Sequence, residues 1–537
     1  MVEHIKSLYD DSMSGDTQRR YEYFLGNPVA PNTSAAYKAT VDSVIPVKAE
    51  PGSVLSIVDE GRKFEINFDG EKSMNARWFR INAGQELVFS SNKKFFMGNP
   101  ISLIQEKPHK HKLILLILVD SLAQTVLETD GFEELMPYTS TFFSNAIYMQ
   151  ECYCCSDWTL PACATVFTGK YPYEHKMLHP DGGKLQQDTF VKLFKDAGYL
   201  TGYFNSNWRM PPEYGYIEGF DRGIYCRGDC RGKCVSLIEC MMDHLYAFPN
   251  RDHFITLSLY DLHHHYFLDL PREVGTQARE TLEEQAYRPP SSRKPTETPY
   301  VPMIAEIYKK QLKFMDYKLQ MLYSFLSSNY TSDEYVVLFC ADHGESTLSP
   351  PDFPLTRPIR SNPKAKHFLP RFLDFLRKQG VPFHIDTQEK SFILMNFQNS
   401  MQKTPLLIQS SSTKREDVFA LTDLRSVYDI FSCILKNVEA FNNDEVKTIC
   451  KREYVYNESI YPGQTYKAKI IDRQVVLYFE SDELINENCC LTNSSGHMAL
   501  FLRKNYEKLP DNPNIFEKYA PVIREHISQL GKNGSTE

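Results

Sequence analysis

Residues 113–119 read LILLILV, an unbroken apolar run that ends at Asp120. A strand buried on both faces of a parallel sheet shows this pattern, whereas a strand with one solvated face alternates apolar and polar residues. The run is too short for a membrane-spanning helix, which needs about 20 apolar residues. We therefore expect a central strand with helices on both sides of its sheet.

Two later apolar runs end in a similar way. ITLSLYDLHHH reaches Asp261 and His263, and VVLFCADHGE reaches Asp342 and His343. Between them, residues 306–328 have the pattern of a long amphipathic helix. Alternating strands and helices predict an α/β fold with a mostly parallel sheet between helices.

The pattern changes along the chain and predicts four parts. Residues 1–36 are polar and are expected to be a helical or loosely ordered lead, and residues 37–106 form a small β-rich unit of short alternating strands. Residues 107–445 are the α/β part, with a Pro-rich insert at about 348–389, and residues 446–537 return to a small sheet with a helical tail.

The net charge and the absence of targeting signals limit which partners and which location we expect for the protein. The 537 residues carry a formal net charge of −8 with Lys and Arg interspersed, so no surface for nucleic acid is indicated. The N-terminus lacks the apolar core of a signal peptide, and no transmembrane run is present. We expect a soluble, cytoplasmic protein.

The 13 cysteines cannot all pair within one chain, and reduced thiols are the expectation. In CRGDCRGKC, residues 226–234, thiols recur every four residues and would share one helical face. This spacing matches no common zinc site, so we interpret these cysteines as structural thiols.

Asp120, His263, Asp342 and His343 all lie at or just beyond the ends of apolar strands. In open α/β sheets the working residues lie beyond the carboxyl ends of the strands. Each motif alone fits a helix cap or a turn equally well. Together, carboxylates and imidazoles at one edge predict a divalent metal held by oxygen and nitrogen ligands.

The segment CSDWTLPACATVFTGKYP, residues 155–172, places Thr159 at the start of an expected helix. Thr159 could be an ordinary N-cap, because threonine is a common residue there. It could also be a nucleophile, since a nearby cation activates a hydroxyl and backbone N–H groups at a helix start attract an anion.

Five segments now establish a resemblance to the sulfatase branch of the alkaline phosphatase superfamily. They occur in that family's order: VDSL (119–122), WTLPACATVFTGKYP (158–172), GYIEGFDRG (215–223), YDLHHHY (260–266) and ADHGE (341–345). The resemblance covers roughly residues 112–480 and implies an alkaline-phosphatase-like sheet between helices with a smaller C-terminal sheet. It also implies that Asp120, Asp342 and His343 hold a metal together with Thr159, the nucleophile, and that His263 lies near the substrate.

The chain departs from the family at the nucleophile. Sulfatases that form formylglycine have Cys or Ser there, followed by x-Pro-Ser-Arg, whereas this chain reads Thr159-Leu160-Pro161-Ala162-Cys163. Threonine cannot give the formylglycine aldehyde. The chain is more similar to the threonine-nucleophile members, such as lipoteichoic acid synthases and phosphoethanolamine transferases.

The sequence thus predicts a metal-dependent hydrolase or phosphotransferase acting on phosphate esters, with phosphodiesters preferred and glycan-linked esters included. The imidazole ligand favours Mn²⁺ or Zn²⁺, although Mg²⁺ and Ca²⁺ also accept such ligands. Further candidates for substrate contact are Lys170, His175, Asn207 and Arg209. Two alternatives stay open: a sulfate-ester hydrolase without formylglycine, and a non-catalytic binding protein that retains the fold.

Overall fold

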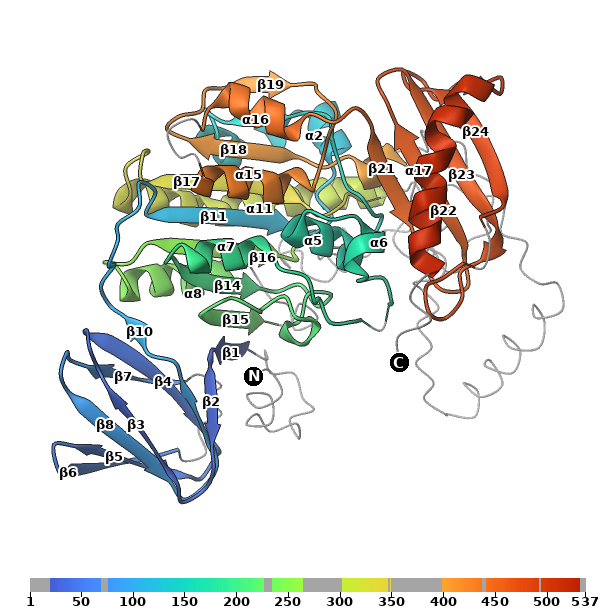
Figure 1. Ribbon diagram of the computed structural model, residues 1–537. Helices are drawn as coiled ribbons and strands as arrows, with labels where there is room; N and C mark the ends of the chain where they lie inside the picture. The colour runs from blue at the N-terminus through green and yellow to red at the C-terminus, as the bar shows by residue number, and fades with distance from the viewer. Residues whose placement is uncertain are drawn as a thin grey trace.

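The computed structural model describes residues 20–68, 76–180, 182–226, 234–263, 302–345, 348, 398–436, 441–491 and 494–531. The predicted insert at about 348–389, Cys230, His264 and His265 lie outside the described residues, apart from Leu348. Figure 1 shows a central α/β part, with a β unit at the N-terminal side (blue) and a sheet with one long helix at the C-terminal side (red). No helix among the described residues is long and apolar enough to cross a membrane.

The largest sheet has nine strands in the order β1-β15-β14-β16-β11-β17-β18-β12-β19. Their bounds are β1 (Arg20–Phe24), β15 (Arg222–Cys226), β14 (Leu200–Asn205), β16 (His253–Leu259), β11 (Leu113–Val119), β17 (Tyr335–Ala341), β18 (Leu406–Ser410), β12 (Ile147–Met149) and β19 (Glu416–Val418). The five strands from β15 to β17 are parallel, and β1 and β18 run antiparallel to their neighbours. The predicted fold class, a mostly parallel sheet between helices, is confirmed.

Strand β11 lies at the centre of this sheet, and all seven of its side chains are buried. Val119 pairs with both Leu259 of β16 and Ala341 of β17, so three strands end at the same level. Parallel strands present their carboxyl ends at one edge, and this register brings the residues that follow them together.

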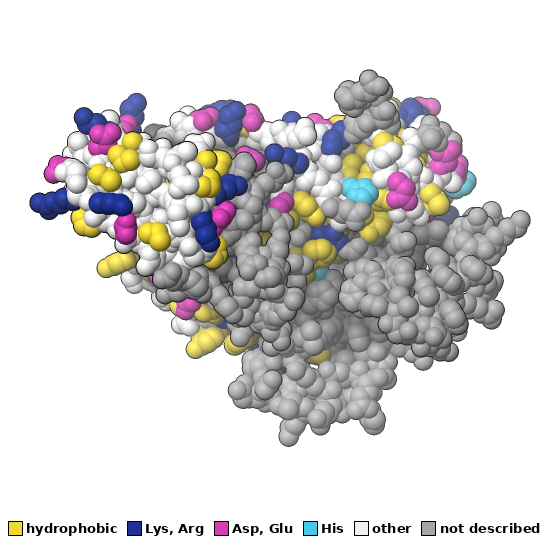
Figure 2. All heavy atoms as spheres, turned by 90° about the horizontal axis from the view of Figure 1, so that it is seen from below, with side chains coloured by type: hydrophobic (Ala, Val, Ile, Leu, Met, Phe, Trp, Pro, Cys, Tyr) yellow, Lys and Arg dark blue, Asp and Glu magenta, His cyan; other side chains and the backbone are white. Residues whose placement is uncertain are grey.

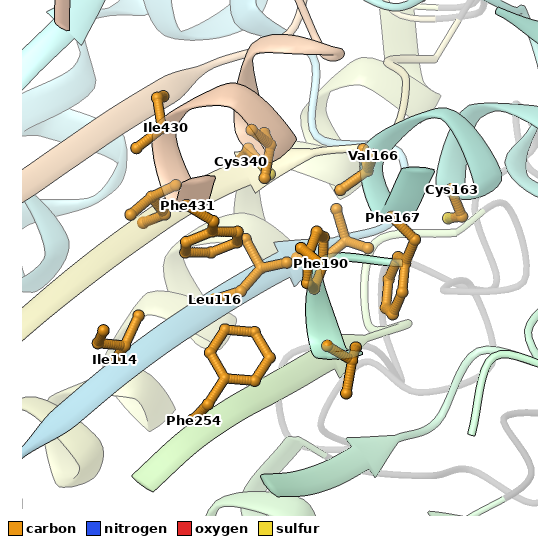
Figure 3. Close-up of a cluster of buried hydrophobic side chains, with 14 of the residues drawn as sticks. Ile114, Leu116, Cys163, Val166, Phe167, Phe190, Phe254, Cys340, Ile430 and Phe431 are labelled. Atoms are coloured by element: carbon orange, nitrogen blue, oxygen red, sulfur yellow. The ribbon is translucent and has the colours of Figure 1, made fainter. Parts of the chain in front are cut away.

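Helices cover both faces of the sheet. Their bounds are α2 (Gln124–Asp130), α3 (Phe132–Leu135), α4 (Pro137–Phe142), α5 (Thr159–Thr168), α6 (Pro172–His175), α7 (Phe190–Asp196), η1 (Pro212–Tyr214), α8 (Cys234–Ala247), α11 (Pro302–Asn329), α14 (Asn399–Gln402), α15 (Ser426–Lys436), α16 (Asn443–Cys450) and α17 (Pro513–Gly531). Alternate side chains of β11 serve the two faces, because successive residues of a strand point to opposite sides. Leu116 packs with Phe190 of α7 and Phe431 of α15, as Figure 3 shows, whereas Leu115 belongs to the cluster that includes α8 and α11.

The N-terminal β unit consists of two small sheets. Their strands are β2 (Gly26–Val29), β3 (Ser34–Lys38), β4 (Ser43–Ala49), β5 (Val54–Asp59), β6 (Arg62–Asn67), β7 (Arg77–Ile81), β8 (Glu86–Ser91), β9 (Phe95–Gly98) and β10 (Ile101–Ser102). Residues 20–36, which we expected to be helical or loosely ordered, instead form β1, β2 and the start of β3. The reason is tertiary: β1 pairs with β15 and buries Tyr23 and Phe24 in the main core. In Figure 2 the visible face of this unit, on the left, carries intermingled acidic and basic side chains.

The C-terminal sheet is antiparallel and follows chain order from β21 to β25. Its strands are β21 (Val455–Ser459), β22 (Thr465–Ile471), β23 (Val475–Leu484), β24 (Gly496–Leu502) and β25 (Lys508–Leu509). One face packs against α17 through Tyr466, Leu477 and Ile523. The opposite face meets the α/β part, where Val476 and Tyr478 join a cluster with Tyr153 of β13 (Cys152–Tyr153). The short strand β20 (Thr422–Asp423) pairs with β13.

No disulfide joins the cysteines of the described residues. The predicted boundaries of the four parts stay predictions.

Candidate active site

Two carboxylates and one imidazole meet beyond the carboxyl ends of β11 and β17. Asp120 follows β11, and Asp342 and His343 follow β17. One ligand atom from each of the three lies within 4.8 Å of the other two, and all three side chains are buried. Within the described part of the chain, no other group of three or more His, Cys, Asp or Glu residues meets in this way.

The electrostatics of this cluster favour a cation. Burial and the neighbouring charge of Asp342 raise the pKa of Asp120 to about 7. Burial opposes charging of His343, yet Asp342 and Asp120 together raise its pKa above the ordinary value. Burying two ionised carboxylates side by side costs free energy unless a positive charge compensates them. The donor set, two carboxylate oxygens and one imidazole nitrogen, therefore fits a divalent metal ion.

The hydroxyl of Thr159 points into the same cluster. Its Oγ1 lies 3.0 Å from Nε2 of His343 and 3.3 Å from Oδ2 of Asp120, and the residue is 3% exposed. Trp158, with extended backbone dihedrals of −156° and 160°, is the N-cap residue of α5, and no side chain caps the helix. Thr159 is therefore the first helical residue, and its hydroxyl is directed at the carboxylates and the imidazole, not at the backbone.

Asn207 and Ser121 hold the first carboxylate in place. Asn207, just beyond β14, donates from Nδ2 to Oδ2 of Asp120 at 2.6 Å. Ser121 donates from Oγ to Oδ1 of Asp120 at 2.7 Å and from its backbone N–H to Oδ1 of Asp342 at 3.1 Å. Ser121 has a φ of +62°, a left-handed conformation that a non-glycine residue seldom adopts. The sequence did not indicate this bridging role, because it depends on a backbone angle and on a contact between residues 221 positions apart.

Gly344 explains why the turn after β17 can pass so close to α14. Its N–H donates to the carbonyl of Met401 at 2.7 Å. A Cβ added at Gly344 would lie 1.9 Å from the carbonyl oxygen of Ser400, a distance that no side chain tolerates. The glycine of the DHG motif thus lets the backbone approach α14 and fixes the turn that carries Asp342 and His343.

Arg209 lies beside the start of α5. Its guanidinium carbon is 3.8 Å from the ring centroid of Trp208 and 5.6 Å from that of Trp158. Its Nη1 donates to the carbonyl of Pro180 at 2.6 Å, and its backbone N–H donates to Oδ1 of Asn207. These contacts attach the Asn207–Arg209 loop to the residue that precedes Thr159.

His263 is connected to the same loop through Tyr260. Nδ1 of His263 lies 2.7 Å from the Tyr260 hydroxyl, and the two rings stack with centroids 4.5 Å apart. The Tyr260 hydroxyl also accepts a hydrogen bond from Nε1 of Trp208 at 2.6 Å. Asp261, the other candidate at this strand end, instead pairs with Lys318 at 3.0 Å.

Lys170 and His175 are not brought to the cluster. Lys170 is exposed and follows the far end of α5, eleven residues from Thr159, which corresponds to roughly 16 Å along a helix. His175 is buried at the end of α6, where Nε2 lies 3.2 Å from Oγ1 of Thr165 and Nδ1 accepts from the backbone of Met177. Burial lowers the pKa of His175 to about 3, so this imidazole is neutral.

The α/β part of the chain is similar to known proteins in both sequence and structure. Residues 112–438 match the sequence model of the family described as Sulfatase. The structure is similar to that of a phosphonate monoester hydrolase from Silicibacter pomeroyi, with 13% identity and a TM-score of 0.51, over 78% of this chain and 94% of that chain. A Bacteroides thetaiotaomicron protein described for the metabolism of multiple glycosaminoglycans gives 13% identity and a TM-score of 0.50, over 78% and 96%. At this identity the two likenesses show the fold alone. No curated protein matches the chain by sequence.

Proposed function

This chain belongs to the sulfatase family, and we propose that it is a metal-dependent hydrolase or phosphotransferase that acts on phosphate esters, preferably phosphodiesters, through Thr159. The observation that carries the proposal is the position of the Thr159 hydroxyl, 3.0 Å from His343 and 3.3 Å from Asp120 at the first residue of a helix. A hydroxyl with no capping role, held among candidate metal ligands, is arranged as a nucleophile would be.

Asp120, Asp342 and His343 would hold one divalent cation, with Thr159 beside it. The imidazole favours Mn²⁺ or Zn²⁺, and oxygen donors also suit Mg²⁺ or Ca²⁺. A divalent cation held there supplies positive charge that activates a nearby hydroxyl and stabilises charge developing on a phosphoryl oxygen.

The protein's own groups account for the remaining steps. The Thr159 hydroxyl releases its proton to solvent, Oγ1 attacks phosphorus in line, a new P–O bond forms, and the bond from phosphorus to the leaving oxygen breaks. Backbone N–H groups at the start of α5 and the guanidinium of Arg209 stabilise the phosphoryl oxygens, because unsatisfied helix N–H groups attract anions. His263 gives a proton to the leaving oxygen. Water or an acceptor hydroxyl then attacks the phosphothreonine and gives its proton to His263, the bond from phosphorus to Oγ1 breaks, and Oγ1 takes up a proton from solvent to restore the Thr159 hydroxyl.

The identity of residue 159 separates this chain from sulfatases that form formylglycine. Thr159 carries a methyl group on Cβ and cannot be oxidised to an aldehyde, and Ala162-Cys163 stand where the maturation signal has Ser-Arg. Phosphate esters are the preferred substrates because a threonine alkoxide displaces a phosphoryl group directly. The family match to Sulfatase keeps sulfate-ester hydrolysis as the second candidate.

The deciding experiment measures turnover of three aryl substrates by metal-reconstituted protein: a phosphate monoester, a phosphodiester and a sulfate ester. We expect phosphodiester turnover that is abolished in Thr159→Ala. Sulfate turnover that survives in Thr159→Ala would overturn the threonine mechanism. Tight metal binding with no turnover of any ester would instead support a non-catalytic binding protein.

A further inference from the structure

The turn that follows β11 adopts a backbone conformation that needs support from its surroundings. Ser121, directly after Asp120, has a φ of +62° and is 1% exposed. A non-glycine residue in this left-handed region costs free energy, and it persists where the surrounding structure holds it. Asn32 and Glu60 also have positive φ, but both lie in exposed turns. Ser121 is instead enclosed by the core, so the groups that hold its conformation can be identified.

The hydroxyl of Tyr308 closes this turn. Tyr308 belongs to α11 and is completely buried. Its hydroxyl donates to the carbonyl of Ser121 at 2.9 Å and accepts from the N–H of Ala123 at 3.1 Å. Within the described ranges of the chain, no other hydrogen bond reaches either of these two backbone groups. One side chain thus satisfies both buried groups and fixes the backbone on either side of Leu122.

The same turn contacts both carboxylates of the candidate metal site. The backbone N–H of Ser121 donates to Oδ1 of Asp342 at 3.1 Å, and its Oγ donates to Oδ1 of Asp120 at 2.7 Å. Both donors belong to one residue, so their directions follow from its backbone angles. A change in φ at Ser121 would turn the N–H away from Asp342 and displace the hydroxyl from Asp120. Tyr308 therefore acts on the two carboxylates through Ser121.

The far end of the turn lies against the second turn that carries ligands. A Cβ added at Gly344 would lie 3.3 Å from Cα of Ala123, so the turns after β11 and β17 pack together at this point. Burial raises the pKa of Tyr308, and the charges of Glu345 and Asp120 act in the same direction, whereas the N–H of Ala123 opposes them. The hydroxyl at this junction therefore keeps its proton and remains a donor.

Tyr323 provides an internal comparison on the same helix. It lies 15 residues beyond Tyr308, which corresponds to roughly 22 Å along a helix, and is 5% exposed. Its hydroxyl is 2.9 Å from Oγ1 of Thr139, which in turn donates to Oδ1 of Asp316. This network joins α11 to α4 and not to the turn after β11. The helix thus carries two buried tyrosine hydroxyls with similar demands for a partner, and only that of Tyr308 meets the ligand-bearing turn.

We infer that Tyr308 is a positioning residue of the metal site, whose hydroxyl holds the Ser121 turn and thereby directs the carboxylates of Asp120 and Asp342 toward one cation. Groups that orient metal ligands contribute to metal affinity without contact with the metal. The inference rests on the divalent cation of the proposed function, but it does not depend on the reaction or on the substrate.

The test measures metal binding in the absence of any substrate. Isothermal titration calorimetry of the metal-stripped full chain with Mn²⁺ and with Zn²⁺ compares wild type, Tyr308→Phe and Tyr323→Phe. We expect Tyr308→Phe to weaken metal binding by about tenfold, and Tyr323→Phe to leave it within about twofold. Urea unfolding of the metal-free proteins is the control, because each variant loses a buried hydroxyl and both midpoints should fall.

Equal metal affinities in wild type and Tyr308→Phe, or equal losses in Tyr308→Phe and Tyr323→Phe, would overturn the inference. Turnover of the aryl phosphodiester keeps its failure distinct from that of the proposed function. A wild type that binds the metal with this dependence on Tyr308, yet turns over no phosphate ester, retains the positioning role without the reaction. An active enzyme whose metal affinity ignores Tyr308 retains the reaction without the positioning role.

Ser121→Ala tests the route from Tyr308 to the carboxylates. This variant keeps the tyrosine and loses the hydrogen bond to Asp120, so it should also weaken metal binding, and it carries the test if Tyr308→Phe does not fold. In its background Tyr308→Phe should cause a smaller fold loss than in wild type, because one of the two contacts is already missing. Unchanged metal affinity in Ser121→Ala, or equal fold losses in the two backgrounds, would overturn the route through Ser121.

Discussion

The two ends of helix α5 place the same kinds of residue in opposite electrostatic settings. At its start, the Thr159 hydroxyl faces His343, whose pKa is raised above its ordinary value because Asp342 and Asp120 outweigh burial. Near its end, the Thr165 hydroxyl faces His175, whose pKa falls to about 3 because burial disfavours the charged ring and the charges of Lys176 and Lys170 act in the same direction.

The difference teaches that burial and a threonine–histidine contact do not by themselves make a reactive site. Both histidines are buried, and both contacts are close to 3 Å. What separates them is the pair of carboxylates that the ends of β11 and β17 deliver to one end of the helix only. The carboxylates create a place for a cation, and a cation is what a weak hydroxyl nucleophile requires.

The largest difference is expected when a threonine hydroxyl is removed at the start of α5 or at its end, because only the first removal should lower kcat. Thr159→Ala should reduce kcat by at least about 1,000-fold with folding retained, because the proposed nucleophile is lost. Thr168→Ala removes a buried hydroxyl that donates to the carbonyl of Ala164 at 2.7 Å, and should cost about 1 kcal/mol of stability with little change in kcat. Initial rates on the aryl phosphodiester and urea unfolding measure both. Comparable rate losses in the two variants would contradict the distinction.

Removing the Asp342 carboxylate tests whether the cluster at the start of α5 binds a divalent cation. In Asp342→Asn, stabilisation by Mn²⁺ or Zn²⁺ should disappear, whereas wild type should gain about 2.7 kcal/mol when the metal is at 100 times its Kd. Asp261→Asn is the matched control, because Asp261 also follows a strand end but pairs with Lys318. Thermal unfolding with and without metal gives the answer. Metal stabilisation that persists in Asp342→Asn would exclude Asp342 as a ligand.

Acid should destabilise the folded protein through His175, the buried histidine near the end of α5. In the unfolded chain His175 takes up a proton below its ordinary pKa of 6.5, whereas the folded protein keeps it neutral down to about pH 3. Stability is therefore lost as pH falls from 6.5, by about 2 kcal/mol between pH 6.5 and 5. His175→Gln should remove this part of the slope in urea unfolding. An unchanged slope in His175→Gln would show that the imidazole is not held neutral.

The smallest effect is expected from the charge at the far end of α5. Lys170→Ala should change stability by no more than about 0.5 kcal/mol and kcat/KM by about twofold or less, because the side chain is exposed and distant from Thr159. A tenfold loss in kcat/KM would restore Lys170 as the substrate contact that the sequence suggested. The same initial-rate assay decides this.

The buried parallel strands of the main sheet were open to prediction, whereas its edge strand β1 was not. The seven apolar residues of β11 and the similar runs of β16 and β17 predicted a buried parallel sheet, because only such strands lack polar alternation. Residues 20–36 were read as part of a polar lead and were expected to be helical or loosely ordered, yet β1 completes the edge of the main sheet by pairing with β15. A short edge strand takes its conformation from its partner, and its local sequence pattern does not predict it.

The sequence by itself determined that Asp120, Asp342 and His343 would stand at one edge of a sheet, since the ends of parallel strands have a common edge. It also determined that residue 159 is a threonine, which excludes an aldehyde nucleophile. Only the tertiary structure decided that Thr159 faces Asp120 and His343, that His175 is a neutral core residue and that Ser156 pairs with Glu458, some 300 residues further along the chain. These outcomes depend on register and on the approach of distant segments, and such contacts are set by packing and not by local propensity.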